Sequence, residues 1–189
     1  MDKEVPAGSS TSAFGQLALG ISLLAFGLGN TGVIDGVTAA GSVSLATYVG
    51  GVALFIAGLF ALRERDVLTG TAFALLGALW FTWGVSADQR MPSGAAGLFL
   101  LLFALVALTL TAGSGGAPLL TRALYVLLFL AFVLLALGQF RGSGWLTQAG
   151  GWFAVADGAL AWYAGTAVLA HWPTALPAHA GGRGVTVTG

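Results

Sequence analysis

The sequence GGWFAVADGALAWYAG, residues 150–165, decides the fold because it predicts a helix that crosses a membrane. It is the centre of an apolar run over residues 149–170, which at about 1.5 Å per residue is long enough to span a bilayer. Gly151, Gly158 and Gly165 recur every seven residues and therefore fall on one helix face. A face of bare glycines lets a neighbouring backbone come close, so we expect tight helix packing here.

Asp157 lies in the middle of this stretch and is the only ionisable side chain deep inside an apolar run of the sequence. A carboxyl at membrane depth is costly in free energy, and it usually faces a partner or a water-filled path. Asp157 is therefore the first candidate for a functional residue.

The composition is that of a membrane protein. The chain of 189 residues is 57% hydrophobic and 7% charged, whereas a soluble domain carries about 25% charged residues. Its net charge of zero favours no nucleic-acid partner, and the absence of cysteine excludes disulfides and thiolate metal sites. Residues 1–12 lack the basic region of a signal peptide, so the first apolar run should remain as a helix.

Apolar runs of about the length of a membrane span occur along the whole chain. The six runs cover residues 13–30, 44–62, 69–86, 95–112, 122–140 and 149–170. Because backbone groups in lipid must be satisfied within the segment, we predict an all-α integral membrane protein with six transmembrane helices in one bundle. Residues 1–12 would form a cytoplasmic amino-terminal segment, 13–171 the transmembrane domain and 172–189 a disordered cytoplasmic tail.

Basic residues predict the orientation of the bundle. The side of the amino terminus carries Lys3, Arg63, Arg65, Arg122 and Arg183, and the other side carries Arg90 and Arg141. Since positively charged loops remain in the cytoplasm, this excess places both termini there. We therefore expect a multi-pass protein of the cell (plasma) membrane.

Glycines at seven-residue spacing also occur in the first three runs. They are Gly20 and Gly27, Gly51 and Gly58, and Gly70, Gly77 and Gly84. We expect these three helices and the last one to pack closely around a common axis. The runs 95–112 and 122–140 are richer in Leu, Val and Phe, which suits contacts with lipid or with other subunits.

Motifs of enzymes and metal sites are absent from the sequence, which has no phosphate-binding loop, HExxH or GxSxG. The two histidines, His171 and His179, lie at the end of the last helix and beyond it. Residues at membrane depth cannot assemble a nucleophile, a base and an oxyanion site. We therefore expect no enzyme, cofactor or metal, but a path lined by small residues, a few hydroxyls and amides, and one carboxyl.

A set of short motifs follows in order along the chain. They are Asn30-x-Gly32, Gly50-Gly51 with Ala57-Gly58-Leu59, Thr71-Ala72-Phe73 with Gly77 and Trp80, Gly150-Gly151-Trp152 and Ala161-Trp162-Tyr163. This ordered set resembles the acetate uptake transporter family, the succinate–acetate permeases, over residues 13–170. The resemblance implies six helices per subunit, a hexameric ring, a pathway within each subunit, and proton-linked uptake of acetate and related small carboxylates, succinate included.

The chain departs from the family's pattern, which makes it a divergent member. Residues 10–15 read STSAFG where the family has an Asn-Pro-Ala-Pro-Leu-Gly type signature. The resemblance places the family's narrow point on Leu19, Leu76 and Leu128, and a pathway position that affects substrate size on Ala161. An all-leucine constriction would exclude water, so a bare acetate ion would cross poorly and neutral acetic acid better.

Polar contacts beside the constriction are expected from hydroxyls and amides, because no Lys or Arg lies at membrane depth. The candidates are Gln16, Ser22, Asn30, Thr71 and Tyr125. Gln16 and Ser22 lie one turn on either side of the gate leucine of the first helix, and Tyr125 lies three residues before that of the fifth. Weak binding by such groups would suit rapid flux.

Asp157 lies four residues before Ala161 and therefore on the same helix face. Together with Gly150 and Ala154 they form a stripe of small side chains with one acid, the candidate wall of the pathway. An ionised Asp157 would repel a carboxylate, whereas a protonated one would donate a hydrogen bond. We hypothesise that Asp157 takes part in proton coupling or tunes selectivity; the alternative is a buried carboxyl held by a structural hydrogen bond.

Three functions fit these observations. The first is a transporter or channel for acetate and similar small monocarboxylates, linked to protons. The second is a channel for small neutral solutes such as urea or short amides, which the all-leucine gate favours. The third is a non-transporting membrane sensor or assembly protein, which predicts no continuous polar path through the subunit.

Overall fold

The computed structural model describes residues 8–38, 41, 47–87 and 91–172. The described chain is helical and has no strand. Its elements are α1 (Gly8–Thr31), the π-helix η1 (Thr47–Ala53), α3 (Leu54–Arg63), α4 (Val67–Ala87), α5 (Ser93–Gly113), α6 (Leu119–Arg141) and α7 (Gly144–Ala170). Outside the described residues lie Lys3, Arg90, His179, Arg183 and the predicted tail from residue 173 onward.

The predicted all-α membrane fold is confirmed. Five described helices are long and apolar enough to cross a membrane, and η1 with α3 forms a shorter apolar segment, Thr47–Arg63. This segment is the described part of the run predicted over residues 44–62. Its first seven residues are π-helical, so it continues from a wider helix into a regular one.

All five long helices begin before the apolar runs that predicted them, α1 and α7 by the most. α1 begins at Gly8 within the polar segment 1–12, and the Thr11 hydroxyl on this first part donates a hydrogen bond to Glu64 Oε1 at 2.8 Å. α7 begins at Gly144, directly after Gly142 ends α6 in the left-handed conformation at φ 59°. The extension of α1 is polar, whereas that of α7 includes apolar residues and a buried leucine.

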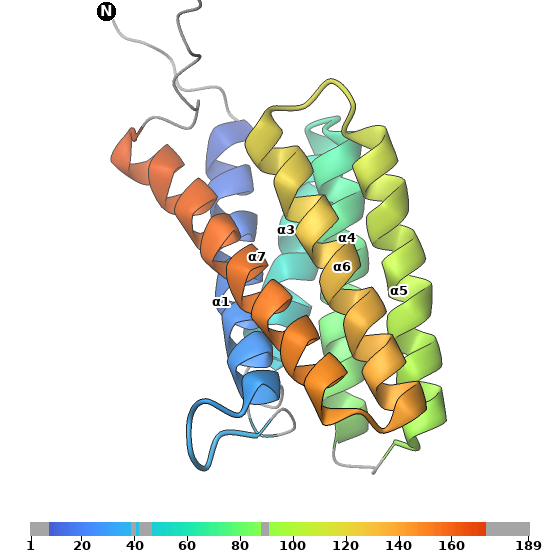
Figure 1. Ribbon diagram of the computed structural model, residues 1–189. Helices are drawn as coiled ribbons and strands as arrows, with labels where there is room; N and C mark the ends of the chain where they lie inside the picture. Colours follow the sequence, from blue (N-terminus) through green and yellow to red (C-terminus); the bar gives the residue numbers. More distant parts are fainter. Residues whose placement is uncertain (1–7, 39–40, 42–46, 88–90, 173–189) are drawn as a thin grey trace, which may run out of the picture.

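The helices form a ring around one core (Figure 1). α1 packs most extensively against α7, α7 against α6, and α6 against α5. α5 touches α4, which packs against η1 and α3, and these return to α1. The side chains that face inward make up a single large hydrophobic cluster with contributions from α1 and α3 to α7.

Glycines determine the closest approach between α1 and α7. A Cβ atom on Gly20 would lie 2.6 Å from the backbone nitrogen of Trp162, and one on Gly158 would lie 2.7 Å from that of Leu24. The contacts are made to backbone atoms, which cannot move aside as a flexible side chain can. The glycine face predicted on the last helix therefore packs against the first helix.

The other glycine series joins η1 and α3 to α4. A Cβ on Gly58 would lie 2.8 Å from the Cα of Ala74, and one on Gly77 would lie 2.6 Å from the nitrogen of Phe55. The four glycine-bearing segments thus form two close pairs, α1 with α7 and η1/α3 with α4. The two pairs meet through α1, which contacts η1, α3 and α4, and α5 and α6 close the ring on the other side.

Both ends of the described chain lie at the same end of the bundle. Figure 1 shows the start of α1 and the end of α7 together there, near the loop between α5 and α6. The turn between α3 and α4 lies at this end as well, because it carries Glu64, the partner of Thr11. A chain that crosses the membrane an even number of times has both of its ends on the same side, as this arrangement does.

Candidate functional site

The four residues predicted at the constriction, Leu19, Leu76, Leu128 and Ala161, belong to one buried cluster. Each exposes 4% of its surface or less. They come from α1, α4, α6 and α7, and so from both sides of the ring. The structure brings all four into the space that the ring encloses; the passage of a solute between them stays a prediction.

Leu19 and Leu76 lie at similar depth in the bundle. Gly15 of α1 lies against the ring of Phe73 of α4, and the two leucines follow by about one turn on their helices, which run in the same direction. The antiparallel register of α1 and α7 places Ala161 at this level too. These three residues therefore face one another across one layer of the core.

Leu128 lies about one turn away, at the level of Asp157. A Cβ on Gly150 of α7 would lie 2.7 Å from Cγ of Leu135 of α6, and this antiparallel register sets Leu128 opposite Asp157. The predicted constriction residues thus occupy two neighbouring layers. Gly150, the first residue of the predicted stripe, packs against Leu135 of α6, which belongs to the same core.

Asp157 is buried, with 1% of its surface exposed, and its Oδ1 atom has no hydrogen-bond partner in the described structure. No structural hydrogen bond from a described residue therefore holds this oxygen of the carboxyl, as the alternative interpretation of Asp157 would require. Tyr125 of α6 lies within electrostatic range of Asp157, and also of Asp66 in the turn before α4. The charged residues of α6, Arg122 and Arg141, are exposed near its two ends.

Two further buried polar atoms of the described chain are without a partner. They are Nε1 of Trp80 on α4 and Oε1 of Gln16 on α1. An unpaired buried polar group costs about 1–3 kcal/mol, so each of these atoms calls for an explanation. Trp80 belongs to the motif that carried the family resemblance, but the sequence did not indicate it as a site residue.

The other predicted polar contacts differ in how far they are free to bind a solute. The Ser22 hydroxyl donates to the Ala18 carbonyl and the Asn30 amide donates to the Phe26 carbonyl, each at 2.8 Å. The Ser22 O–H is thus occupied within α1, whereas the Asn30 amide group carries a second N–H and an oxygen besides. Thr71 is half-buried on α4.

Tyr125 lies in a second, smaller cluster. It packs with Ala72 of α4 and Leu110 of α5, near the start of α6, which lies at the end of the bundle where α1 begins and α7 ends. Its position is thus nearer the predicted cytoplasmic side than the leucine layers.

Aromatic rings occupy the opposite half of the core, which the sequence did not predict as a unit. The ring of Phe26 contacts Trp80 edge-on with centroids 5.1 Å apart, and contacts Trp83 at 5.9 Å. Phe99 and Phe103 of α5 continue this series at 5.9 and 5.0 Å. The rings come from three helices, so no periodicity within one segment reveals them.

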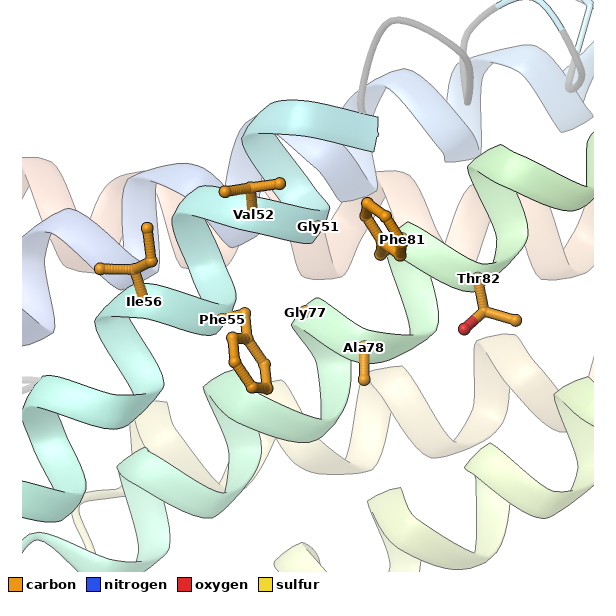
Figure 2. A pocket seen from close by; sticks show the side chains of 8 residues that line it. All are labelled: Gly51, Val52, Phe55, Ile56, Gly77, Ala78, Phe81 and Thr82. Carbon is orange, nitrogen blue, oxygen red and sulfur yellow. The ribbon is translucent and has the colours of Figure 1, made fainter.

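A groove on the outside of the bundle is separate from these residues. Figure 2 shows it between η1/α3 and α4, with a volume of about 320 Å³. Its side chains, among them Val52, Ile56, Phe81 and Thr82, are exposed and point away from the core. The groove lies on the outer surface of the ring, away from the buried cluster.

Comparison with known proteins identifies the family. The model of the GPR1/FUN34/yaaH family matches residues 6–176. The chain belongs to this family. The resemblance to the acetate uptake transporter family that the motifs indicated is confirmed, and the chain is a divergent member of it.

Two yeast proteins are similar to this member of the GPR1/FUN34/yaaH family. "Ammonia transport outward protein 2" of Saccharomyces cerevisiae is 30% identical over 158 residues, which cover 72% of this chain and 56% of that protein. "Accumulation of dyads protein 2" of the same yeast is 27% identical over 133 residues, covering 64% and 47%. The chain thus spans about half the length of these two relatives.

The fold is that of a solved membrane channel. The "bacterial acetate channel SatP" superposes with a TM-score of 0.77 at 22% sequence identity, over 86% of this chain and 92% of that one. The arrangement of helices described above is therefore shared with a membrane channel.

Proposed function

We propose that this protein conducts acetate and similar small monocarboxylates across a membrane, with a proton accompanying each carboxylate. The observation that carries the proposal is the meeting of Leu19, Leu76, Leu128 and Ala161 in one buried cluster inside the helix ring. The GPR1/FUN34/yaaH family and the SatP fold support it, since a solved neighbour is described as an acetate channel. No enzymatic chemistry enters this proposal.

The leucine layers would act as a barrier that favours uncharged species. A narrow apolar constriction loses its water, and an ion that enters must give up hydration that leucine side chains cannot replace. A neutral acid gives up much less. The barrier therefore links transport to protonation of the solute without a separate coupling machinery.

Asp157 would add selectivity at the level of Leu128. Among the described residues of α1, α6 and α7, no Lys or Arg lies at this depth, and the titratable group facing Asp157 from α6 is Tyr125. An ionised Asp157 repels a carboxylate ion and accepts a hydrogen bond from a neutral acid. This places proton coupling in the same two layers as the constriction.

Flux of labelled acetate into proteoliposomes tests the proposal. Neutral acetic acid crosses lipid by itself, so protein-free liposomes of the same lipid give the background that is subtracted. We expect saturable uptake above this background, inhibited by propionate and faster at low pH. A rate equal to the background across the pH range would contradict the proposal and support a sensor or assembly protein.

A second candidate is conduction of a small neutral nitrogen compound. It is favoured by the apolar core and by the 30%-identical relative named for ammonia transport. Uptake of labelled methylammonium in the same liposomes separates the two candidates. The second is established if methylamine crosses the membrane without inhibition by acetate while acetate flux stays at background. Urea and acetamide are further substrates to compare.

Assembly and location complete the proposal. We propose a homo-oligomer, a hexamer as in the family resemblance, with each subunit holding its own pathway. The cell membrane is the proposed location, with both termini in the cytoplasm as the basic residues predict. Native mass spectrometry of the protein in detergent would give the subunit number directly.

A further inference from the structure

We infer that Trp80 and Asp157 form a mid-membrane binding site for a neutral solute that carries both a hydrogen-bond donor and an acceptor. The solute class that fits the proposed function is a protonated small monocarboxylic acid. This inference deepens the proposed function and rests on it for the identity of the solute. Trp80 is not among the residues on which the proposed function depends, so its role in binding is an addition to it.

The first support is that the two side chains are complementary and that each carries a buried atom without a partner. Trp80 Nε1–H can only donate, and an ionised Asp157 can only accept. Both residues expose 1% of their surface, and neither Nε1 of Trp80 nor Oδ1 of Asp157 has a partner in the described structure. Buried polar groups are almost always paired, so a donor and an acceptor left open together point to a missing bridging group.

The second support is their common depth. Gly158, the neighbour of Asp157, meets the backbone of α1 at Leu24. On the other side of the ring, a Cβ on Gly50 would lie 2.5 Å from Oγ of Ser22 and 2.9 Å from Cγ of Trp80, which places the indole beside this part of α1. Both groups are thus within about one helical turn of each other along the bundle axis.

The third support is that both groups adjoin the same enclosed core. Trp80 belongs to the large cluster that contains Leu128 and Ala161, and its ring is held edge-on by Phe26. Asp157 lies on α7 between Ala154 and Ala161, which belong to the same cluster. Leucine side chains lie on one side of this depth and aromatic rings on the other, and Nε1 of Trp80 and Oδ1 of Asp157 are its buried polar atoms without a partner among the described residues.

The chemistry selects a neutral acid. Its carbonyl oxygen accepts from the Trp80 N–H, and its hydroxyl donates to the Asp157 carboxylate. No covalent bond changes, and the proton travels with the solute. A carboxylate ion has no proton to donate and faces a negative charge, so it binds poorly unless Asp157 itself carries the proton; either way, one proton is held between the two carboxyl groups.

Solutes of matched size test the hydrogen-bonding pattern in the wild-type protein. Acetic acid, acetamide and acetone have the same number of heavy atoms, but acetone has no donor. We expect acetamide to inhibit acetate flux in proteoliposomes and acetone not to inhibit it. Equal inhibition by both, or by neither, would overturn the inference.

Substitutions test the two residues. Trp80→Phe removes the N–H while keeping an aromatic ring, and we expect it to lower acetate flux about tenfold, the equivalent of one lost hydrogen bond to the solute. The matched control Trp83→Phe changes a partly buried ring of the same aromatic series and should leave flux unchanged. Asp157→Leu should lower flux to a similar extent as Trp80→Phe. Wild-type rates in Trp80→Phe would contradict the role of the indole.

Binding without transport separates this site from the proposed function. The chain has 6 tryptophans, so ¹⁵N-tryptophan labelling gives a small set of indole N–H signals, and the signal lost in Trp80→Phe belongs to Trp80. Acetamide should shift that signal saturably, and acetone should not. A shift in a protein without flux would leave the site standing and the transport function rejected; wild-type flux without a shift would reject the site alone.

Discussion

Asp157 is a single carboxyl among the alanines and glycines of α7, and its effect on a solute depends on charge as well as on hydrogen bonding. An ionised carboxylate accepts stronger hydrogen bonds than an amide does, and it repels an anion that the amide tolerates. The identity of this one side chain therefore determines which form of an acid the surrounding apolar layers admit.

Replacement of Asp157 by Asn tests this argument through pH dependence. The amide oxygen still accepts from a neutral acid, but without charge assistance, so we expect acetate flux at low pH to fall about threefold. At high pH the repulsion of the anion is gone, and flux should fall less steeply than in the wild type. The measurement is proteoliposome uptake over a pH series; an unchanged rate and pH profile would show that Asp157 has no part in coupling.

Leu76 tests the constriction. Leu76→Ala removes a side chain that is 1% exposed in the core, and we expect uptake of lactate or butyrate relative to acetate to rise about tenfold, because the wider layer admits the extra atoms. The matched control is Leu75→Ala, its neighbour on α4, which is 39% exposed and faces outward. Equal selectivity in the two variants would place the constriction elsewhere.

At the scale of elements, glycine spacing determines how closely helices approach. The seven-residue repeats predicted tight packing from sequence, and the structure confirms that Gly20 and Gly158 meet opposing backbones. The choice of partners was not predictable, because a glycine face is equally open to any neighbour. The π-helix η1 could not be predicted either, because a run of apolar residues does not indicate which helical form it takes.

Gly158→Ala tests the α1–α7 contact. The added methyl would lie 2.7 Å from the nitrogen of Leu24 and 2.9 Å from the carbonyl oxygen of Gly20, so the helices must separate. We expect a loss of about 1–3 kcal/mol in the free energy of unfolding, measured by denaturant titration in detergent micelles. The control Gly94→Ala, in the first turn of α5, has no atom within 4 Å of its new methyl and should be neutral or stabilising. Similar losses in both would show that the close contact is unimportant.

At the scale of the whole molecule, the ring of helices gives each end of the bundle a separate set of loops. The loop between α5 and α6 lies at the end where α1 begins and α7 ends. The turn between α6 and α7 lies at the opposite end. The basic residues predict that the first of these ends is cytoplasmic.

Single cysteines test this orientation in a chain that has none of its own. Gly116→Cys and Gly144→Cys occupy exposed positions with open space around them. In intact cells, a membrane-impermeant maleimide should label Gly144→Cys and leave Gly116→Cys unlabelled until the cells are opened. The reverse pattern would invert the predicted topology without affecting the fold.

The sequence by itself determined that this is an all-α membrane protein of the GPR1/FUN34/yaaH family and that Asp157 is its one carboxyl deep inside an apolar run. Hydropathy, glycine spacing and ordered motifs are local properties, so they are readable along the chain. The assembly of the helices alone established that the glycine helices form two pairs, that Gly150 packs against α6, and that Nε1 of Trp80 and Oδ1 of Asp157 are buried without a partner among the described residues. Those facts depend on which helices are neighbours in the ring, and the free energy of that choice is distributed over contacts between segments far apart in sequence.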